Sequence, residues 1–112
     1  MQSLALQTHP KEAFAVLSGK PVGSELKVSE LVFQPFLNTT RSTHFTIDKY
    51  AITDFAGTFH SHPVPDATPS RADKRLFFEH PGVHCIMPFP YKELFVYNKN
   101  GELLERKIVH KV

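Results

Sequence analysis

The stretch TFHSHPVPDATPSRADKRLFF, residues 58–78, places two histidines one residue apart at the end of an apolar run. That run is expected to form a strand, on which side chains at positions i and i+2 point to the same face. A helix is predicted over residues 70–80, and Pro81-Gly82 ends it. Regular structure is excluded from the loop between them by three prolines, Pro63, Pro65 and Pro69. The stretch therefore predicts a strand, a stiff loop, and a helix that returns close to the strand's end.

The sequence on both sides of this stretch predicts further strands. Residues 26–36 and 44–47 are expected to be extended, after a turn at residues 21–23. Strands are also expected at residues 83–89 and 94–97, and Asn100-Gly101 is a strong hairpin signal before a return strand over residues 103–109. The strands and helices together predict one small α/β domain in which a mixed sheet is flanked by helices.

A first helix is expected over residues 10–18. Pro10 suits a first-turn position, and Gly19 is typical of the residue that follows a helix. Phe14 and Leu17 are three residues apart, so both can face a core.

The composition narrows the class of protein. The chain has 112 residues, 41% of them hydrophobic, with a net charge of +2 and scattered basic residues, which predicts one domain over residues 1–112 that binds no nucleic acid. No apolar stretch is long enough to span a membrane, and the first residues do not resemble a signal peptide, so a cytoplasmic location is expected. The single cysteine, Cys85, is expected to be a buried thiol in a strand. A disulfide between two copies, and hence a homodimer, stays open.

His60 and His62 are candidate ligands of one metal ion, because the end of one strand face brings two imidazoles together. Catalytic zinc usually has three protein ligands and an open position for water. Asp73, one turn inside the predicted helix, can supply the third ligand, and Asp66 on the loop is a rival. Two histidines, a carboxylate and an open position describe a hydrolytic zinc centre.

The same residues have a reading that needs no metal. Ser70-Arg71-Ala72-Asp73 fits the capping box of a helix N-terminus. Two histidines one residue apart are by themselves a weak signal. The complete string, H-x-H followed by seven residues and then S-x-x-D, is more specific than either part.

This string matches H-[ST]-H-P-x(6)-S-x-x-D, and the chain resembles the JAMM, or MPN+, metalloproteases. Residues 10–19, PKEAFAVLSG, are similar to the family's first helix, with a glutamate near its start and L-S-G at its end. Residues 44–48, HFTID, resemble its F-x-I-D strand. The short length is similar to that of the stand-alone archaeal members. The resemblance implies a single MPN domain with a cytidine-deaminase-like architecture.

The resemblance also implies a role for each matched residue. His60, His62 and Asp73 would bind one Zn²⁺ per chain. Ser70 would hydrogen-bond the attacking water and steady the tetrahedral intermediate. Glu12 would be the general base, a group that hydrolysis of an amide requires in any case. Without the resemblance, Glu12 is an acid in the first turn of a predicted helix, and its rivals for this role are Glu25, Glu30 and Glu79.

The activity implied is that of a zinc metalloprotease, an isopeptidase that cleaves after the C-terminal Gly-Gly of ubiquitin-like small modifier proteins and releases them from their conjugates. The Gly-Gly tail could add as a strand beside residues 44–47. The chain has no room for the insertions with which eukaryotic members grip a second ubiquitin. A prokaryotic modifier or a sulfur-carrier protein is therefore the expected partner.

Three alternatives stay open. The enzyme could trim a sulfur-carrier protein in cofactor or cysteine synthesis, with the same zinc site. A zinc deaminase would need H-x-E and P-C-x-x-C, which this chain lacks. A non-catalytic MPN scaffold is the alternative of another class, although relatives of that kind lack the metal ligands that are present here.

The other histidines are expected to have structural positions. His84, in an apolar strand, is expected to be a core histidine with its hydrogen bonds satisfied. His44 flanks the strand that would line the substrate groove. Three more are expected to be solvated at the ends of elements, namely His9, His80 and His110.

Overall fold

The computed structural model describes residues 1–32, 54–80, 82–105 and 107–110. Over these residues the chain forms two helices and seven strands, in the order α1 (Gln2–Thr8), β1 (Phe14–Val22), β2 (Glu25–Val32), β3 (Phe55–His62), α2 (Arg71–Glu79), β4 (Val83–Pro88), β5 (Phe95–Tyr97), β6 (Leu103–Leu104) and β7 (Lys107–His110).

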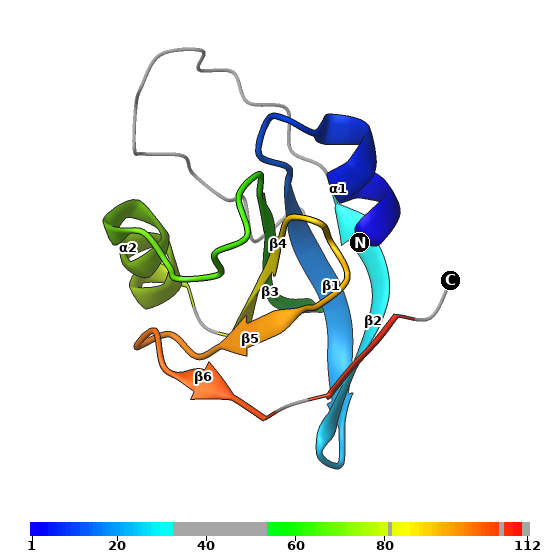
Figure 1. The fold of residues 1–112 in the computed structure, drawn as a ribbon. Helices are drawn as coiled ribbons and strands as arrows, with labels where there is room; N and C mark the ends of the chain where they lie inside the picture. Colours follow the sequence, from blue (N-terminus) through cyan, green and yellow to red (C-terminus); the bar gives the residue numbers. More distant parts are fainter. Residues whose placement is uncertain (33–53, 81, 106, 111–112) are drawn as a thin grey trace.

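The strands form one mixed sheet in the order β6-β5-β4-β3-β1-β2-β7. β3 pairs with β4 in parallel, and β2 with β7 in parallel. The other pairs are antiparallel. Helices α1 and α2 lie on opposite sides of the sheet (Figure 1). The mixed α/β fold that the sequence predicts is thus confirmed.

Apolar side chains form one core cluster on each face of the sheet. One cluster contains Ala5 of α1 together with Leu17 and Phe59. The other contains Leu76 and Phe77 of α2. Both faces of the central strands are covered, and residues 15–19 of β1 are consequently buried without interruption.

The parallel pair β3 and β4 positions the histidine motif. Helix α2 connects these two strands, so its first turn lies near the carboxyl end of β3, where His60 and His62 stand. Ligand sites of open α/β sheets occur at the carboxyl ends of parallel strands. Because β1 runs antiparallel to β3, Phe14 at the start of β1 pairs with His60. The segment that precedes β1 therefore reaches the same end of the sheet.

The helix expected over residues 10–18 is wrong. The chain forms β1 there, a central strand between β2 and β3, and the first helix is α1, earlier in the chain. The run AFAVL contains good helix formers, but a short continuous apolar run is equally consistent with a strand that is buried on both faces. The pairing of β1 with both neighbours decides in favour of the strand.

Most of the other expected elements are confirmed. The predicted helix over residues 70–80 is α2, with Ser70 and His80 as its caps. The turn before β2 lies at residues 23–24. The return strand over residues 103–109 is divided into β6, which pairs with β5, and β7, which crosses to the far edge of the sheet beside β2. The strand expected at residues 44–47 and the end of the one expected at 26–36 lie outside the described residues.

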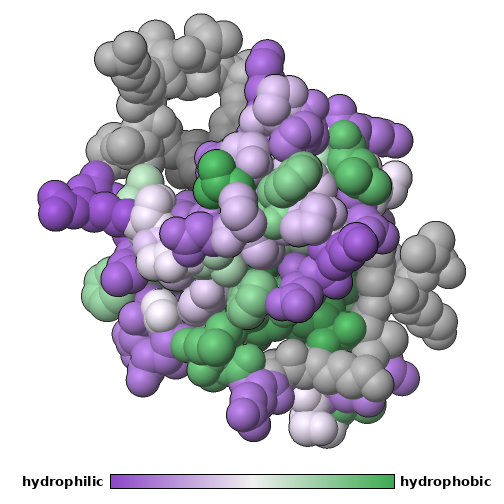
Figure 2. Space-filling view, viewed as in Figure 1, coloured by the Kyte–Doolittle hydropathy of each residue, from purple (hydrophilic) through white to green (hydrophobic). Residues whose placement is uncertain are grey.

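The described surface is mixed in character. Among the described residues, no helix is long and apolar enough to cross a membrane. On the face that Figure 2 shows, hydrophilic residues are spread over much of the surface, and hydrophobic ones form a larger patch in its lower half and smaller patches above it. Cys85 is buried in β4, as expected, and its burial raises the pKa of the thiol to about 12.

Candidate metal centre

His60 and His62 lie on the face of β3 that α2 covers. Both residues are buried. The ring of His60 packs between Phe14 and Phe77, with ring centroids 4.9 Å and 6.5 Å away. Strand alternation thus places the two imidazoles on one face, as the sequence predicts, and aromatic packing holds the first of them.

A hydrogen bond to the proline-rich loop orients the second imidazole. His62 Nδ1 lies 2.9 Å from the carbonyl oxygen of Asp66. A carbonyl can only accept, so Nδ1 carries the proton and Nε2 is the atom turned toward the site. The loop is fixed one residue later, where the Tyr97 hydroxyl donates to the carbonyl of Ala67 at 2.8 Å.

Ser70 and Asp73 form the capping box that their spacing predicts. The Ser70 hydroxyl accepts from the Asp73 backbone nitrogen at 3.0 Å, and the Asp73 carboxylate accepts from the Ser70 backbone nitrogen at 2.9 Å. The interpretation of Ser70 and Asp73 as a capping box is therefore correct. The cap does not account for every contact of the Asp73 carboxylate, because the same side chain also contacts the two histidines.

Asp73 joins the two imidazoles. Its Oδ2 lies 3.2 Å from His62 Nε2, and its Oδ1 lies 3.3 Å from His60 Nδ1. The Asp73 side chain is only 13% exposed. The structure therefore brings together the three side chains that the sequence suggested as ligands.

The three side chains are of the kinds that bind zinc, but in this structure the Asp73 carboxylate contacts the two imidazoles directly. Zinc takes imidazole nitrogen and carboxylate oxygen at about 2.0 to 2.2 Å, so two ligands of a tetrahedral ion are about 3.3 Å apart. The two contacts of Asp73 match that separation. Among the described residues, however, no group of three His, Cys, Asp or Glu side chains is already spaced about a metal ion. Small side-chain rotations would be needed for all three to face one ion.

The contacts between Asp73 and the histidines shift the pKa values of His62 and Asp73. The hydrogen bond to Asp73 raises the pKa of His62, against the opposing effect of burial. Burial acts to raise the pKa of Asp73, but its hydrogen bonds with His60 and His62 outweigh burial and hold that pKa well below its ordinary value. An ionised carboxylate beside two imidazoles favours any cation that binds there, and a metal ion would compete with the proton for His62.

Glu12 stands at the edge of this group. It lies in the segment between α1 and β1, with Oε1 3.9 Å from His62 Nε2 and a side chain that is 65% exposed. The sequence placed it in the first turn of a helix, which is wrong, yet its nearness to the histidines is what the resemblance implied. An exposed carboxylate beside the site can exchange protons with a bound water molecule.

The rival residues lie elsewhere. The Asp66 carboxylate accepts from the backbone nitrogen of Thr68 at 2.9 Å, within its own loop. Its contribution to the site is the backbone carbonyl that orients His62, which the sequence did not reveal. Glu25 lies at the far end of the β1–β2 hairpin, Glu30 pairs with Ser18, and Glu79 is at the C-terminal end of α2.

His84 is the core histidine that the sequence predicts. The Thr58 hydroxyl lies 2.7 Å from its Nδ1, and its Nε2 lies 3.0 Å from the carbonyl of His80, to which it donates. Burial lowers the pKa of His84 to about 4. His9 is exposed, as expected, whereas His80 is buried and the prediction that it is solvated is wrong.

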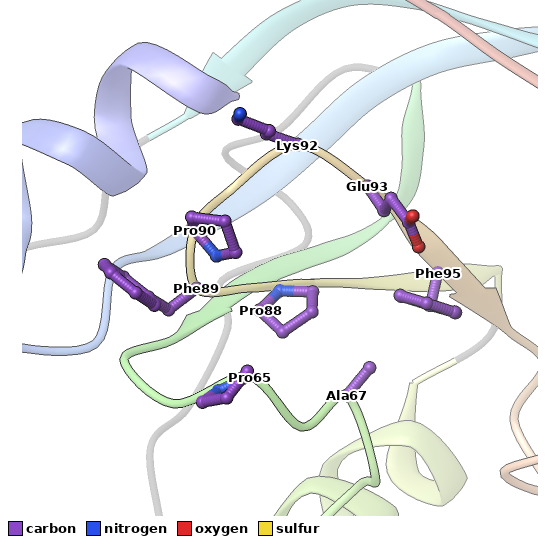
Figure 3. A pocket seen from close by; sticks show the side chains of 8 residues that line it. All are labelled: Pro65, Ala67, Pro88, Phe89, Pro90, Lys92, Glu93 and Phe95. Atoms are coloured by element: carbon purple, nitrogen blue, oxygen red, sulfur yellow. The ribbon is translucent and has the colours of Figure 1, made fainter.

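A cleft lies next to the histidines. It has a volume of 310 Å³ and is lined by Pro65, Ala67, Pro88, Phe89, Pro90, Lys92, Glu93 and Phe95. Figure 3 shows Pro65 and Ala67 on one wall and Pro88 and Phe95 on the strands opposite. Pro88 pairs with His62 in the β3–β4 ladder, so the cleft begins one strand away from the candidate metal centre.

Comparison with protein families identifies the fold family. Residues 1–92 match the family described as "Prokaryotic homologs of the JAB domain". The chain belongs to this family. The search of the curated proteins found no match.

Solved structures agree with the family. A JAB1/MPN domain protein from Archaeoglobus fulgidus is 33% identical, with a TM-score of 0.71 over 96% of this chain and 89% of that one. A structure described as "JAMM: A Metalloprotease-like Zinc Site in the Proteasome and Signalosome" is 33% identical, with a TM-score of 0.69 over 96% of this chain and 86% of that one. A solution structure from Desulfitobacterium hafniense is 29% identical, with a TM-score of 0.62 over 99% and 86% of the two chains. The JAB/MPN fold and the family resemblance are thereby confirmed.

Proposed function

We propose that this JAB-domain protein is a zinc-dependent peptidase of the JAMM type. The observation that carries the proposal is the Asp73 carboxylate, which contacts both His60 and His62 at the carboxyl end of β3. A helix cap alone does not require two histidines beside it. The likeness to a structure described as a metalloprotease-like zinc site supports the same conclusion.

In this proposal His60, His62 and Asp73 hold one Zn²⁺. The ion, when bound, would polarise the scissile carbonyl and lower the pKa of a water molecule. Glu12 takes a proton from the attacking water and returns it to the leaving amine, a role that suits an exposed carboxylate at the edge of the site.

Ser70 would stabilise the negative charge that develops on the carbonyl oxygen of the substrate. Its oxygen accepts from the Asp73 backbone nitrogen, so the hydroxyl proton can still be donated. A hydrogen bond from this hydroxyl to the carbonyl oxygen would strengthen as charge develops there. Loss of such a donor in other hydrolases costs about 2.7 to 4 kcal/mol.

The substrate is proposed to be the conjugate of a ubiquitin-like small modifier, cleaved after its C-terminal Gly-Gly. This part of the proposal rests on the motif resemblance described above. Residues 44–47, which the sequence predicts to be a strand and beside which the Gly-Gly tail would add, lie outside the described residues.

A cleavage assay tests the proposal. A ubiquitin-like protein joined through Gly-Gly to a lysine side chain is incubated with protein that is zinc-loaded, chelator-treated, or chelator-treated and then reloaded. We expect cleavage that is lost with the chelator and restored by zinc. Linear fusions of a sulfur-carrier protein are tested in parallel. If only they are cleaved, the alternative of sulfur-carrier processing holds. If protein with one bound zinc cleaves neither substrate, the proposed activity is contradicted.

A further inference from the structure

Ser61 stands between the two histidines in the sequence, but strand alternation turns it to the opposite face of β3. The residue is fully buried. Its hydroxyl oxygen accepts from the backbone nitrogen of Ala13 at 2.7 Å, across 48 residues of sequence. Its own backbone nitrogen donates to the carbonyl of Ala13 at 3.1 Å. Ser61 thus binds both polar groups of one residue.

Ala13 is the neighbour of Glu12. Both residues lie in the short segment between α1 and β1, outside helix and strand. The Glu12 side chain is 65% exposed, so packing does little to hold it near His62. The backbone position from which it projects is set at Ala13, and Ser61 fixes that residue by two hydrogen bonds.

A second contact holds the start of the same segment. His9, which ends α1, has its Nδ1 2.5 Å from the hydroxyl of Tyr91. Tyr91 is buried. The segment is therefore anchored at His9 and at Ala13, with Glu12 just before the second anchor.

We propose that the Ser61 hydroxyl is a positioning group for Glu12. The end of β3 would then hold two metal ligands on one face and position the general base from the other face. This inference rests on the proposed function. Ser61 does not touch the reacting atoms, so it acts through the Ala13 backbone alone. A shift of about 1 Å in a reacting group can lower the rate about 100-fold.

The test combines Ser61→Ala with Glu12→Gln. We expect Ser61→Ala to lower kcat by about 10- to 100-fold with little change in KM, while the protein still binds one zinc per chain. In the Glu12→Gln background the same change should have no further effect. Ser29→Ala is the matched control, because its hydroxyl bonds the carbonyl of Ser18 within the same sheet and away from the site. Equal losses in both backgrounds, or loss of zinc, would overturn the inference.

A structural measurement separates this inference from the proposed activity. Crystal structures of the wild-type protein and Ser61→Ala give the separation of Glu12 Oε1 and His62 Nε2, which is 3.9 Å here. Hydrogen exchange reports the Ala13 amide. The inference requires faster exchange and a displaced Glu12 in the variant, whether or not a substrate is known. An unchanged Glu12 position contradicts it, while absent cleavage by wild-type protein contradicts only the proposed activity.

Discussion

His62 and Asp73 meet at 3.2 Å, although one ends a strand and the other caps a helix eleven residues later. The proline-rich loop between them is itself bonded to the first of the two, since His62 also donates to the Asp66 carbonyl. Asp73 therefore has two functions that can be separated experimentally, the helix cap and the contact with the histidines.

Substitution of Asp73 and of Ser70 should separate these two functions. Ser70→Ala removes the acceptor of the cap, so the free energy of unfolding should fall by about 1 kcal/mol with zinc affinity largely retained. Asp73→Asn should lower zinc affinity by more than the roughly 10- to 100-fold that loss of a supporting partner costs. Competition with a chromogenic chelator measures the affinity, and urea unfolding measures stability. Equal zinc affinities of the two variants would contradict Asp73 as a ligand.

Glu12→Gln should slow cleavage strongly, to a low but measurable rate, without loss of zinc. The amide cannot take a proton, and loss of a general base typically costs about 100- to 10,000-fold in rate. The control is Glu25→Gln, at the far end of the β1–β2 hairpin. Zinc content by elemental analysis and cleavage rate are measured on the same preparations. A variant that keeps most of its activity would show that Glu12 is not the base.

His84 should make the protein less stable in acid. Its pKa is about 4 in the folded protein because of burial, against about 6.5 when unfolded. Below pH 6.5 the unfolded chain therefore binds a proton at His84 more readily than the folded protein does. This difference lowers the free energy of unfolding by about 2 kcal/mol between pH 7 and pH 5. Urea unfolding of chelator-treated wild-type protein and His84→Gln gives the two pH dependences. The variant should lack this part of the slope, and identical slopes would refute the assignment.

Cys85 should be inert in the folded protein. Burial raises the pKa of its thiol to about 12, so almost no reactive thiolate is present at neutral pH. A thiol-specific reagent should label it only as fast as the protein unfolds, and fully in urea. Rapid labelling of the native protein, or a disulfide-linked dimer on a non-reducing gel, would contradict this burial.

The part of the site that residues 58–78 form was predictable from sequence. The two-residue period of β3 placed His60 and His62 on one face, and the S-x-x-D pattern predicted the start of α2. Both are local rules, and the structure confirms them. The resemblance to a family then pointed to Glu12, whose nearness to His62 no local rule could give.

The errors have a common physical cause. Residues 10–18 contain helix formers, but pairing with strands on both sides outweighs that preference. His80 follows a helix, where solvation is usual, yet tertiary packing buries it. The hydrogen bond between Ser61 and Ala13 joins residues 48 apart, and no local sequence pattern around either residue predicts it.

Anomalous diffraction from zinc-soaked crystals tests the central claim most directly. We predict a single zinc peak at the carboxyl end of β3, within about 2.0 to 2.2 Å of nitrogens from His60 and His62 and an oxygen from Asp73. The present contacts between Asp73 and the two imidazoles would open to admit the ion. Zinc bound elsewhere, or the same three side chains in unchanged contact at saturating zinc, would contradict the metal centre and the peptidase proposal with it.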